Sequence, residues 1–410
     1  MTQELRRSLG VFDAVVIGLG SMVGAGIFAA LGPAAGAAGS GLLPALGVAA
    51  VVAYCNAMAS ARLAARYPAS GGTYVYGRER LGSFWGYLAG WAFVVGKTAS
   101  CAAMALTVGA YAWPEHAHAV AVGAVVALTL VNYAGIEKSA LLTRVIVAVV
   151  LAVLAAVVAA SAGAGEASRL ALGGDATAGG VLQAAGLLFF AFAGYARIAT
   201  LGEEVRDPAR TIPRAVPIAL GVALAVYAAV AVCVLAVLGP GALAASGAPL
   251  ADAARAADAG WLVPVVTVGA AVAALGSLLS LILGVSRTAL AMARDGYLPA
   301  LLAAVHPRSR VPHHAELAVG AVVALVAATA DVRGAIGFSS FGVLVYYAIA
   351  NASAWTLGSR ERPLAVLGLV GCGALAFALP PASVLAGVGV LAVGLVAYAV
   401  SRGRPARPRR

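Results

Sequence analysis

Charged residues divide the chain into long apolar stretches. The stretches without Asp, Glu, Lys or Arg are 14–61, 81–96 with 98–114, 119–136, 145–165, 176–196, 215–251, 259–286, 317–330, 334–359 and 363–401. A helix needs about 20 residues to cross a membrane, so 14–61 and 363–401 each hold two spans, and the stretch interrupted by Lys97 holds one. The pattern predicts an all-α integral membrane protein with about twelve transmembrane helices. The short stretch 317–330 is expected to borrow residues from 312–316.

Composition supports this class and excludes a soluble fold. Hydrophobic residues make up 62% of the chain and charged residues 10%, whereas soluble domains carry about 25% charged residues. The 50 glycines fit membrane helices, which pack closely through small residues. The cysteines lie in apolar stretches without metal-ligand spacing or a disulfide framework, so no metal or cofactor is expected. They are Cys55, Cys101, Cys233 and Cys372.

The net charge of +11 orients the chain rather than marking it for nucleic acid. Most of the basic residues fall in alternate connections and in the tail 402–410, which places both termini in the cytoplasm if basic loops stay inside. We expect a multi-pass protein of the inner, or cell, membrane whose arginines contact anionic lipids. No soluble stretch is long enough to form a basic nucleic-acid-binding domain.

Glycines interrupt the first span. Gly18, Gly20, Gly24 and Gly26 fall within nine residues, and each costs about 1 kcal/mol in a helix relative to alanine. Close helix packing through Gly20 and Gly24 is one explanation. The other is a helix that unwinds over residues 22–25, which a membrane tolerates only where protein, water or a ligand meets the freed backbone groups.

A weaker interruption occurs at the corresponding place in the sixth span, around Gly194. Interrupted spans at matching positions of two halves indicate an inverted-repeat transporter with a midplane site. Freed N–H groups suit a carboxylate and freed carbonyls an ammonium, so a zwitterionic amino acid fits, and no catalytic residue is needed. The predicted substrate-binding residues are Ser21, Met22, Val23, Gly24, Ala25, Gly26, Phe190, Ala191, Ala193 and Gly194.

Three long motifs carry a family resemblance: residues 20–28, residues 189–215, and residues 286–299 with 305–308 and 311–312. With these motifs in order, the chain resembles the permeases of the amino acid–polyamine–organocation superfamily. It is most similar to the branch of cationic and broad-specificity amino acid transporters. The resemblance implies a five-plus-five inverted repeat, with helices 1 and 6 broken. It divides the chain into a first repeat (11–165), a second repeat (176–359) and two additional helices (363–401).

The chain departs from the relatives in residues tied to ion coupling. Many proton-coupled relatives carry a lysine in helix 5, where this sequence has Val150, and some carry an acid where it has Ala196. A sodium site would need clustered hydroxyls, and Ser277 and Ser280 are not adjacent. Neither ion is therefore favoured by these positions.

Two cations fall at membrane depth. In a functional role, Lys97 is expected to supply the charge missing from helix 5 or to repel cationic side chains of substrates. In a structural role, it is expected to pair with a carbonyl or to face a water-filled vestibule. Arg197 is expected to join an inner gate with Glu203 or Glu204, or else to lie near the substrate carboxylate.

These observations predict a secondary amino acid permease that works by alternating access and is not an enzyme. The substrate is a small-molecule amino acid, and protons are a further candidate partner. A polyamine or organic-amine transporter and an amino acid exchanger are the alternatives. A membrane sensor fits less well, because the tail after Val400 holds no output domain.

Overall fold

The computed structural model describes residues 9–68, 71–135, 140–201, 204–307 and 311–402. The regular secondary structure of the described residues is helical, apart from one isolated parallel bridge between Leu9 and Val205. The helices of its first half are α1 (Val11–Met22), α2 (Ala25–Ala29), α3 (Leu31–Ala38), η1 (Gly39–Gly41), α4 (Leu42–Arg66), α5 (Thr73–Leu81), α6 (Ser83–Ala112), η2 (Pro114–His116), α7 (Ala117–Tyr133), α8 (Ala140–Ser161) and η3 (Ala167–Leu170). Those of its second half are α9 (Ala178–Phe192), η4 (Ala193–Tyr195), α10 (Ala196–Ala199), α11 (Pro208–Ala245), α12 (Pro249–Ala256), η5 (Gly260–Leu262), α13 (Val263–Arg294), η6 (Ala300–Ala303), α14 (His313–Thr329), α15 (Val332–Trp355), α16 (Arg362–Ala378) and α17 (Pro381–Arg402).

Ten helical segments of the described chain are long and apolar enough to cross a membrane. Two more, α14 and α16, are apolar but only 17 residues long, so the count of twelve spans stays a prediction. As expected, α14 takes in residues before 317, since it begins at His313. In order, span 1 is α1 with α2, span 2 is α4, span 3 is α6, span 4 is α7, span 5 is α8, span 6 is α9 with η4 and α10, span 7 is α11, and spans 8 to 12 are α13 to α17.

The helices pack in two groups. Spans 1, 2, 6 and 7 contact one another through the pairs α1–α11, α4–α11 and α4–α9. Spans 3, 4, 8 and 9 form a second group through α6–α7, α6–α13, α6–α14, α7–α13, α7–α14 and α13–α14. We call the first group the bundle and the second the scaffold.

Contacts of the first five spans recur among the next five. Spans 1 to 5 can be matched in order with spans 6 to 10. Under this matching, the contact between spans 1 and 7 (α1–α11) corresponds to the contact between spans 6 and 2 (α9–α4), and both contacts are present. The same matching pairs α6–α7 with α13–α14, α6–α14 with α7–α13, α6–α15 with α8–α13, α4–α15 with α8–α11, and α1–α8 with α9–α15. This regularity is the contact pattern expected of two structural repeats.

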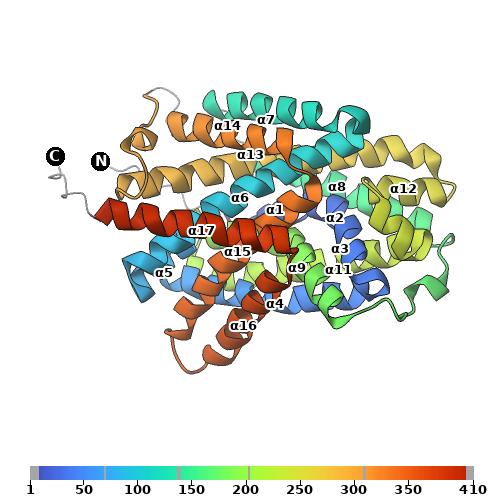
Figure 1. Ribbon diagram of the computed structural model, residues 1–410, viewed down its shortest axis with the longest axis horizontal. Helices are drawn as coiled ribbons and strands as arrows, with labels where there is room; N and C mark the ends of the chain where they lie inside the picture. Colours follow the sequence, from blue (N-terminus) through green and yellow to red (C-terminus); the bar gives the residue numbers. More distant parts are fainter. Residues whose placement is uncertain (1–8, 69–70, 136–139, 202–203, 308–310, 403–410) are drawn as a thin grey trace.

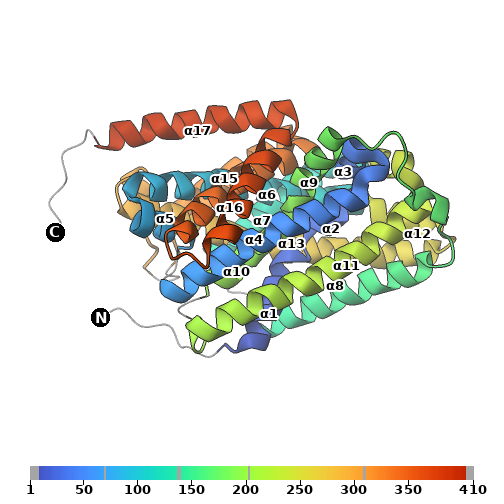
Figure 2. The same ribbon diagram turned by 90° about the horizontal axis from the view of Figure 1, so that it is seen from below.

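The additional helices lie outside the repeating contacts. α16 packs on α4, α9 and α15, and α17 packs on α6 and α15. In both views, α5 and the C-terminal end of α17 lie at one end of the molecule, and α3 and α12 lie at the opposite end (Figures 1 and 2). We call these the α5 end and the α3 end.

Candidate functional site

Span 1 is broken where its glycines predict a break. α1 ends at Met22, α2 begins at Ala25, and Val23 (φ −78°, ψ 52°) and Gly24 (φ −104°, ψ −140°) between them are not helical. The unwinding expected over residues 22–25 is therefore observed at its two central residues, Val23 and Gly24.

Side chains from other helices meet the backbone groups near this break. The hydroxyl of Tyr227, on α11, donates to a pair of carbonyl oxygens, 2.6 Å from Met22 O and 3.0 Å from Ala191 O. Ser277, on α13, donates to the carbonyl of Gly20 at 3.2 Å. Because unpaired carbonyls are costly in lipid, these two side chains make the interruption sustainable.

The glycines also allow close packing, so both explanations of the motif apply. A Cβ at Gly24 would lie 2.4 Å from Ser277 Oγ, and one at Gly26 would lie 2.5 Å from the Ala191 Cα. A Cβ at Gly194 would lie 2.2 Å from the carbonyl oxygen of Ser21. Span 1 thus touches the scaffold on one side and span 6 on the other.

Span 6 is interrupted more mildly than expected. α9 ends at Phe192, a 3-10 turn covers Ala193–Tyr195, and α10 ends at Ala199. Its backbone stays in the right-handed helical region at Ala193 and Ala196, so the turn is tightened rather than unwound. The tighter turn still redirects carbonyl groups, because 3-10 bonds replace the α-helical ones.

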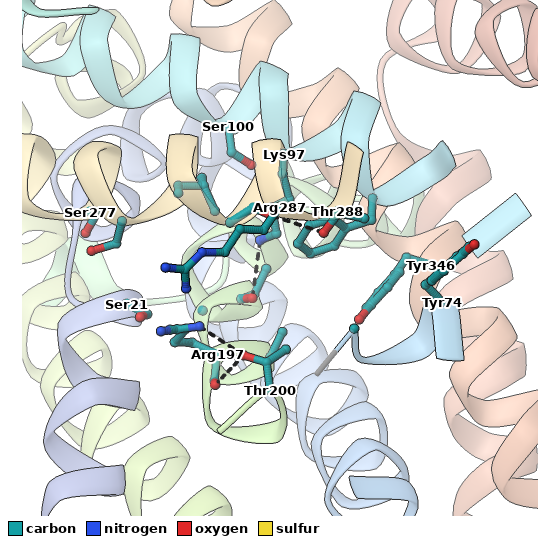
Figure 3. A pocket seen from close by; sticks show the side chains of 18 of the residues that line it. Ser21, Tyr74, Lys97, Ser100, Arg197, Thr200, Ser277, Arg287, Thr288 and Tyr346 are labelled. Carbon is teal, nitrogen blue, oxygen red and sulfur yellow. Dashed lines mark hydrogen bonds between the residues drawn. The ribbon is translucent and has the colours of Figure 1, made fainter. Parts of the chain in front are cut away.

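A cavity of about 260 Å³ begins at these two interruptions and extends toward the α5 end (Figure 3). That volume lies near the lower end of the range of about 300–1,000 Å³ for small-molecule pockets. The lining residues are Ser21, Gly71, Tyr74, Phe93, Lys97, Ser100, Met104, Phe190, Ala193, Gly194, Ala196, Arg197, Thr200, Glu204, Ser277, Ser280, Leu281, Gly284, Arg287, Thr288, Ala291 and Tyr346.

One face of α13 forms the long wall of the cavity. The lining residues from Ser277 to Ala291 recur at helical spacing and cover about 21 Å at 1.5 Å per residue. Ser280 and Arg287 on this face are solvent-exposed although they lie within a span. Water therefore reaches the cavity.

At the α3 end, the connection that precedes α9 is hydrogen-bonded to η1. Asp175 accepts hydrogen bonds from the Ser40 hydroxyl (2.5 Å) and backbone N–H (2.9 Å), and these bonds hold the pKa of Asp175 below its usual value. Gly39 has φ +55°, and a Cβ there would lie 2.1 Å from Asp175 Oδ2. None of the described lining residues comes from α3 or η1.

Four of the ten predicted substrate-binding residues line the cavity: Ser21, Phe190, Ala193 and Gly194. The other six do not line it and are buried behind this surface. They are Met22, Val23, Gly24, Ala25, Gly26 and Ala191. Of the six, only Val23 and Gly24 lie outside helices, and the sequence argument could not show that close packing would cover all six.

Lys97 joins the scaffold to the bundle. It is only 7% exposed, lines the cavity from α6, and its Nζ donates to the carbonyl of Ala193 at 3.3 Å (Figure 3). Tyr347 lies 3.4 Å from the same carbonyl. Pairing with a carbonyl, one of the expected alternatives, is thus observed.

Arg197 and Glu204 both line the cavity, but the described residues contain no ion pair between them. Arg197 donates to Thr200 Oγ1 at 3.3 Å, and Glu203 lies outside the described residues. The guanidinium groups of Arg197 and Arg287 point into the same part of the cavity, near Ser21 (Figure 3).

Valines of α8 pack against spans 1 and 8. Val147 contacts the position of Gly20, and Val153 contacts Gly269 on α13, while Val150 between them is buried. Among the described residues, no cluster of His, Cys, Asp and Glu could hold a metal ion.

Sequence reasoning missed three residues of this site. Tyr227 is a lone tyrosine in an apolar stretch, and its position in span 7 gave no sign that it faces the break. Arg287 was counted among loop cations, since the stretch 259–286 ends one residue earlier. Tyr346 was hidden in the apolar stretch 334–359. The sequence signal for Tyr227 and Arg287 was a polar side chain inside, or directly after, an apolar stretch long enough to span the membrane.

Comparisons with known proteins agree with this architecture. Residues 9–406 match the family model described as amino acid permease. The chain is 74% identical to the uncharacterized transporter Rv1999c of Mycobacterium tuberculosis, over 97% of this chain and 92% of that protein. It is 25% identical to the branched-chain amino acid permease BcaP of Bacillus subtilis (88% and 83% covered) and 29% identical to human cationic amino acid transporter 4 (86% and 60% covered).

The family match covers nearly the whole chain, and the relatives named for a function are transporters. The chain is therefore a multi-pass membrane transporter rather than an enzyme. It belongs to the amino acid permease family of the amino acid–polyamine–organocation superfamily.

Proposed function

We propose that this chain is a secondary amino acid permease that works by alternating access and holds its substrate between the interruptions of spans 1 and 6. The observation that carries the proposal is the water-accessible cavity whose deep end is formed by Ser21, Ala193 and Gly194. An interrupted helix pair at mid-depth offers donors and acceptors without charged side chains.

The ammonium group of the substrate is assigned to the Ala193 carbonyl. Lys97 already places an ammonium 3.3 Å from that oxygen, so the position accepts this group. The substrate carboxylate is placed toward Ser21, which lines the cavity. Substrate and Lys97 then compete for one carbonyl, and the lysine is released from the bundle when substrate binds.

Alternating access follows from movement of the bundle against the scaffold. The repeats are assigned to 11–165 and 176–359, supported by the recurring contacts. The described lining of the cavity extends toward the α5 end, and the basic loops assign this end to the cytoplasm of a cell membrane. The conformation is then inward-facing, with both termini cytoplasmic.

Charge in the cavity favours a substrate without a cationic side chain. The described lining residues include the cations Lys97, Arg197 and Arg287 and one carboxylate, Glu204. Polyamine transport is disfavoured for the same reason. Among the relatives, this substrate class agrees with the name of BcaP rather than with that of cationic amino acid transporter 4.

Uptake of radiolabelled amino acids into proteoliposomes tests the function. We expect neutral amino acids to accumulate, and leucine to compete better than lysine or spermidine. Collapse of accumulation by a protonophore would identify proton symport, whereas uptake that needs only internal amino acid would identify an exchanger. Absence of uptake for every amino acid would contradict the proposal.

A further inference from the structure

A groove of about 360 Å³ lies on α15, between α16 and the first turns of α6, and its walls are apolar. The walls include Trp85 from α6, Phe341 and Ala352 from α15, and Leu369, Gly373 and Phe377 from α16. Trp85 is 43% exposed and Phe377 is 72% exposed, so the groove opens on the outer surface. None of the described residues that line it also lines the transport cavity. The groove is therefore a separate site.

The length of the groove matches one leaflet of a bilayer. Along α15 it extends from Phe341 to Ala352, about 16 Å at 1.5 Å per residue, and the hydrocarbon core of a membrane is about 30 Å thick. Trp85, near the start of α6, and Trp355, at the end of α15, are each 43% exposed. Exposed tryptophans mark the boundary between membrane and water. The groove therefore begins near this boundary at the α5 end and reaches about the middle of the membrane.

Arginines gather where the groove meets this boundary. Arg80, at the end of α5, donates from Nε to Thr356 Oγ1 at 2.7 Å, and Thr356 lies one turn beyond the wall that α15 contributes. Arg362, at the start of α16, lies over the Trp355 ring, 5.5 Å from its centroid. Arg360, two residues earlier, is exposed. Three cations thus lie at this end of the groove.

Their charge is not neutralised by the part of the chain that the structure describes, where none of these three arginines pairs with a carboxylate. Glu361, between two of them, pairs instead with Arg62 at 3.5 Å. Guanidinium groups bind phosphate oxygens well, because their N–H donors are fixed in a fork. Positive charge at the end of an apolar groove therefore matches a molecule that carries a phosphate on a hydrocarbon chain.

We propose that the groove binds an anionic phospholipid from the leaflet at the α5 end. One acyl chain lies between α6, α15 and α16, and the phosphate lies at Arg80, Arg360 and Arg362. The site holds one lipid in a fixed place, unlike the general attraction of basic loops to an anionic surface. The lipid joins α6 of the scaffold to α16, which packs on α4 of the bundle.

A second copy of the chain suits the groove less well than a lipid. Most homodimers have two-fold symmetry, so that the same surface of each copy meets itself. Contact through the groove would bring the arginines of both copies to the same membrane boundary, where like charges repel. A lipid phosphate neutralises these arginines instead.

Filling the groove tests the place of the acyl chain. A Cβ at Gly373 would meet open space, so Gly373→Leu projects into the groove without displacing a neighbour. In native mass spectrometry of the full-length protein, phosphatidylglycerol should bind this variant about tenfold more weakly than the wild type, because leucine displaces about two methylene groups. Gly389→Leu, on α17 outside the groove and with equal free space, should bind as the wild type does. Equal binding to the wild type and Gly373→Leu would overturn the proposal.

Removing one charge tests the place of the phosphate. Arg362→Gln should weaken the binding of phosphatidylglycerol about fivefold and leave that of phosphatidylcholine, which has no net charge, unchanged. Arg333→Gln is the matched control, since Arg333 is exposed and lies beside Gly36 of α3, far along α15 from the arginines. If the wild type bound both lipids equally well, the assignment of an anionic lipid would be wrong.

Thermal unfolding of the delipidated protein in detergent gives an independent readout. A ligand that binds the folded state raises the unfolding midpoint. Phosphatidylglycerol should therefore raise the midpoint of the wild type more than that of Gly373→Leu, while the two midpoints without lipid should be similar. A lipid-free dimer of the wild type that Gly373→Leu abolishes would assign the groove to a second copy and overturn the lipid site.

Discussion

At the scale of single residues, the site is built from backbone carbonyls that specific side chains satisfy. Tyr227 and Ser277 meet the carbonyls beside the break in span 1, and Lys97 meets that of Ala193 in span 6. Each contact joins helices that alternating access would move relative to one another. Substitutions that remove these hydrogen bonds should therefore show which of them stabilise the fold and which are needed for transport.

Lys97 tests the role of the cation at membrane depth. Substitution by methionine removes a charged hydrogen bond worth about 1.5–3 kcal/mol and leaves the Ala193 carbonyl without its lysine partner. We expect gradient-driven uptake to fall by about tenfold or more, with its pH profile altered. Lys97→Arg, which keeps the charge, should retain part of the activity. Unchanged uptake and pH profile in Lys97→Met would assign the residue to structure alone.

Tyr227 tests the support of the break. Tyr227→Phe removes the hydroxyl but keeps the ring, so the carbonyls of Met22 and Ala191 lose a buried donor. The expected loss is about 1–3 kcal/mol of stability, seen as a lower midpoint of thermal unfolding in detergent. Tyr54→Phe, on an exposed surface of α4, should leave the midpoint in place.

At the scale of elements, the two interruptions differ in kind. Span 1 leaves helical geometry at Val23 and Gly24, whereas span 6 keeps it through a 3-10 turn. The sequence predicted the first well, because four clustered glycines weaken a helix wherever it packs. For the second it predicted only a weaker interruption around Gly194, because a lone glycine does not show whether the turn will unwind or tighten into 3-10 geometry. Gly194 is needed because span 1 passes directly against it.

The contact between the two interrupted spans can be tested at Gly194. A Cβ there would lie 2.2 Å from the backbone oxygen of Ser21, which cannot swing aside as a side chain could. Gly194→Ala should therefore abolish uptake and lower the unfolding midpoint. Gly221→Ala, where a Cβ meets open space, should be neutral or stabilising. Normal uptake by Gly194→Ala would show that the spans separate there without cost.

At the scale of the whole molecule, the described lining residues extend toward the α5 end and include none from α3, η1 or α12. The face of α13 from Ser277 to Ala291 leads toward α5, and the Ser40–Asp175 hydrogen bonds tie the α3 end. This arrangement and the recurring contacts between the halves support the proposed movement of the bundle.

Cysteine labelling measures this access and the orientation together. Ser280 is exposed in the cavity, whereas three of the native cysteines are buried and Cys233 is half-buried. Ser280→Cys should react with a membrane-impermeant thiol reagent in inside-out vesicles, and substrate should slow the reaction. Preferential labelling of right-side-out vesicles would reverse the assigned orientation.

The sequence by itself determined the class of protein, the positions of ten spans and the break in span 1. The length of an apolar stretch, the absence of charges within it and a cluster of glycines depend only on residues near one another in the sequence, so they can be interpreted without the tertiary structure. Only the tertiary structure decided which residues face the cavity. Met22 to Gly26 are covered by packing, and Arg287 and Tyr346 line the cavity instead, because exposure depends on which helix lies opposite. The pairing of Lys97 with Ala193 and the groove between α6, α15 and α16 likewise depend on contacts between segments far apart in the chain.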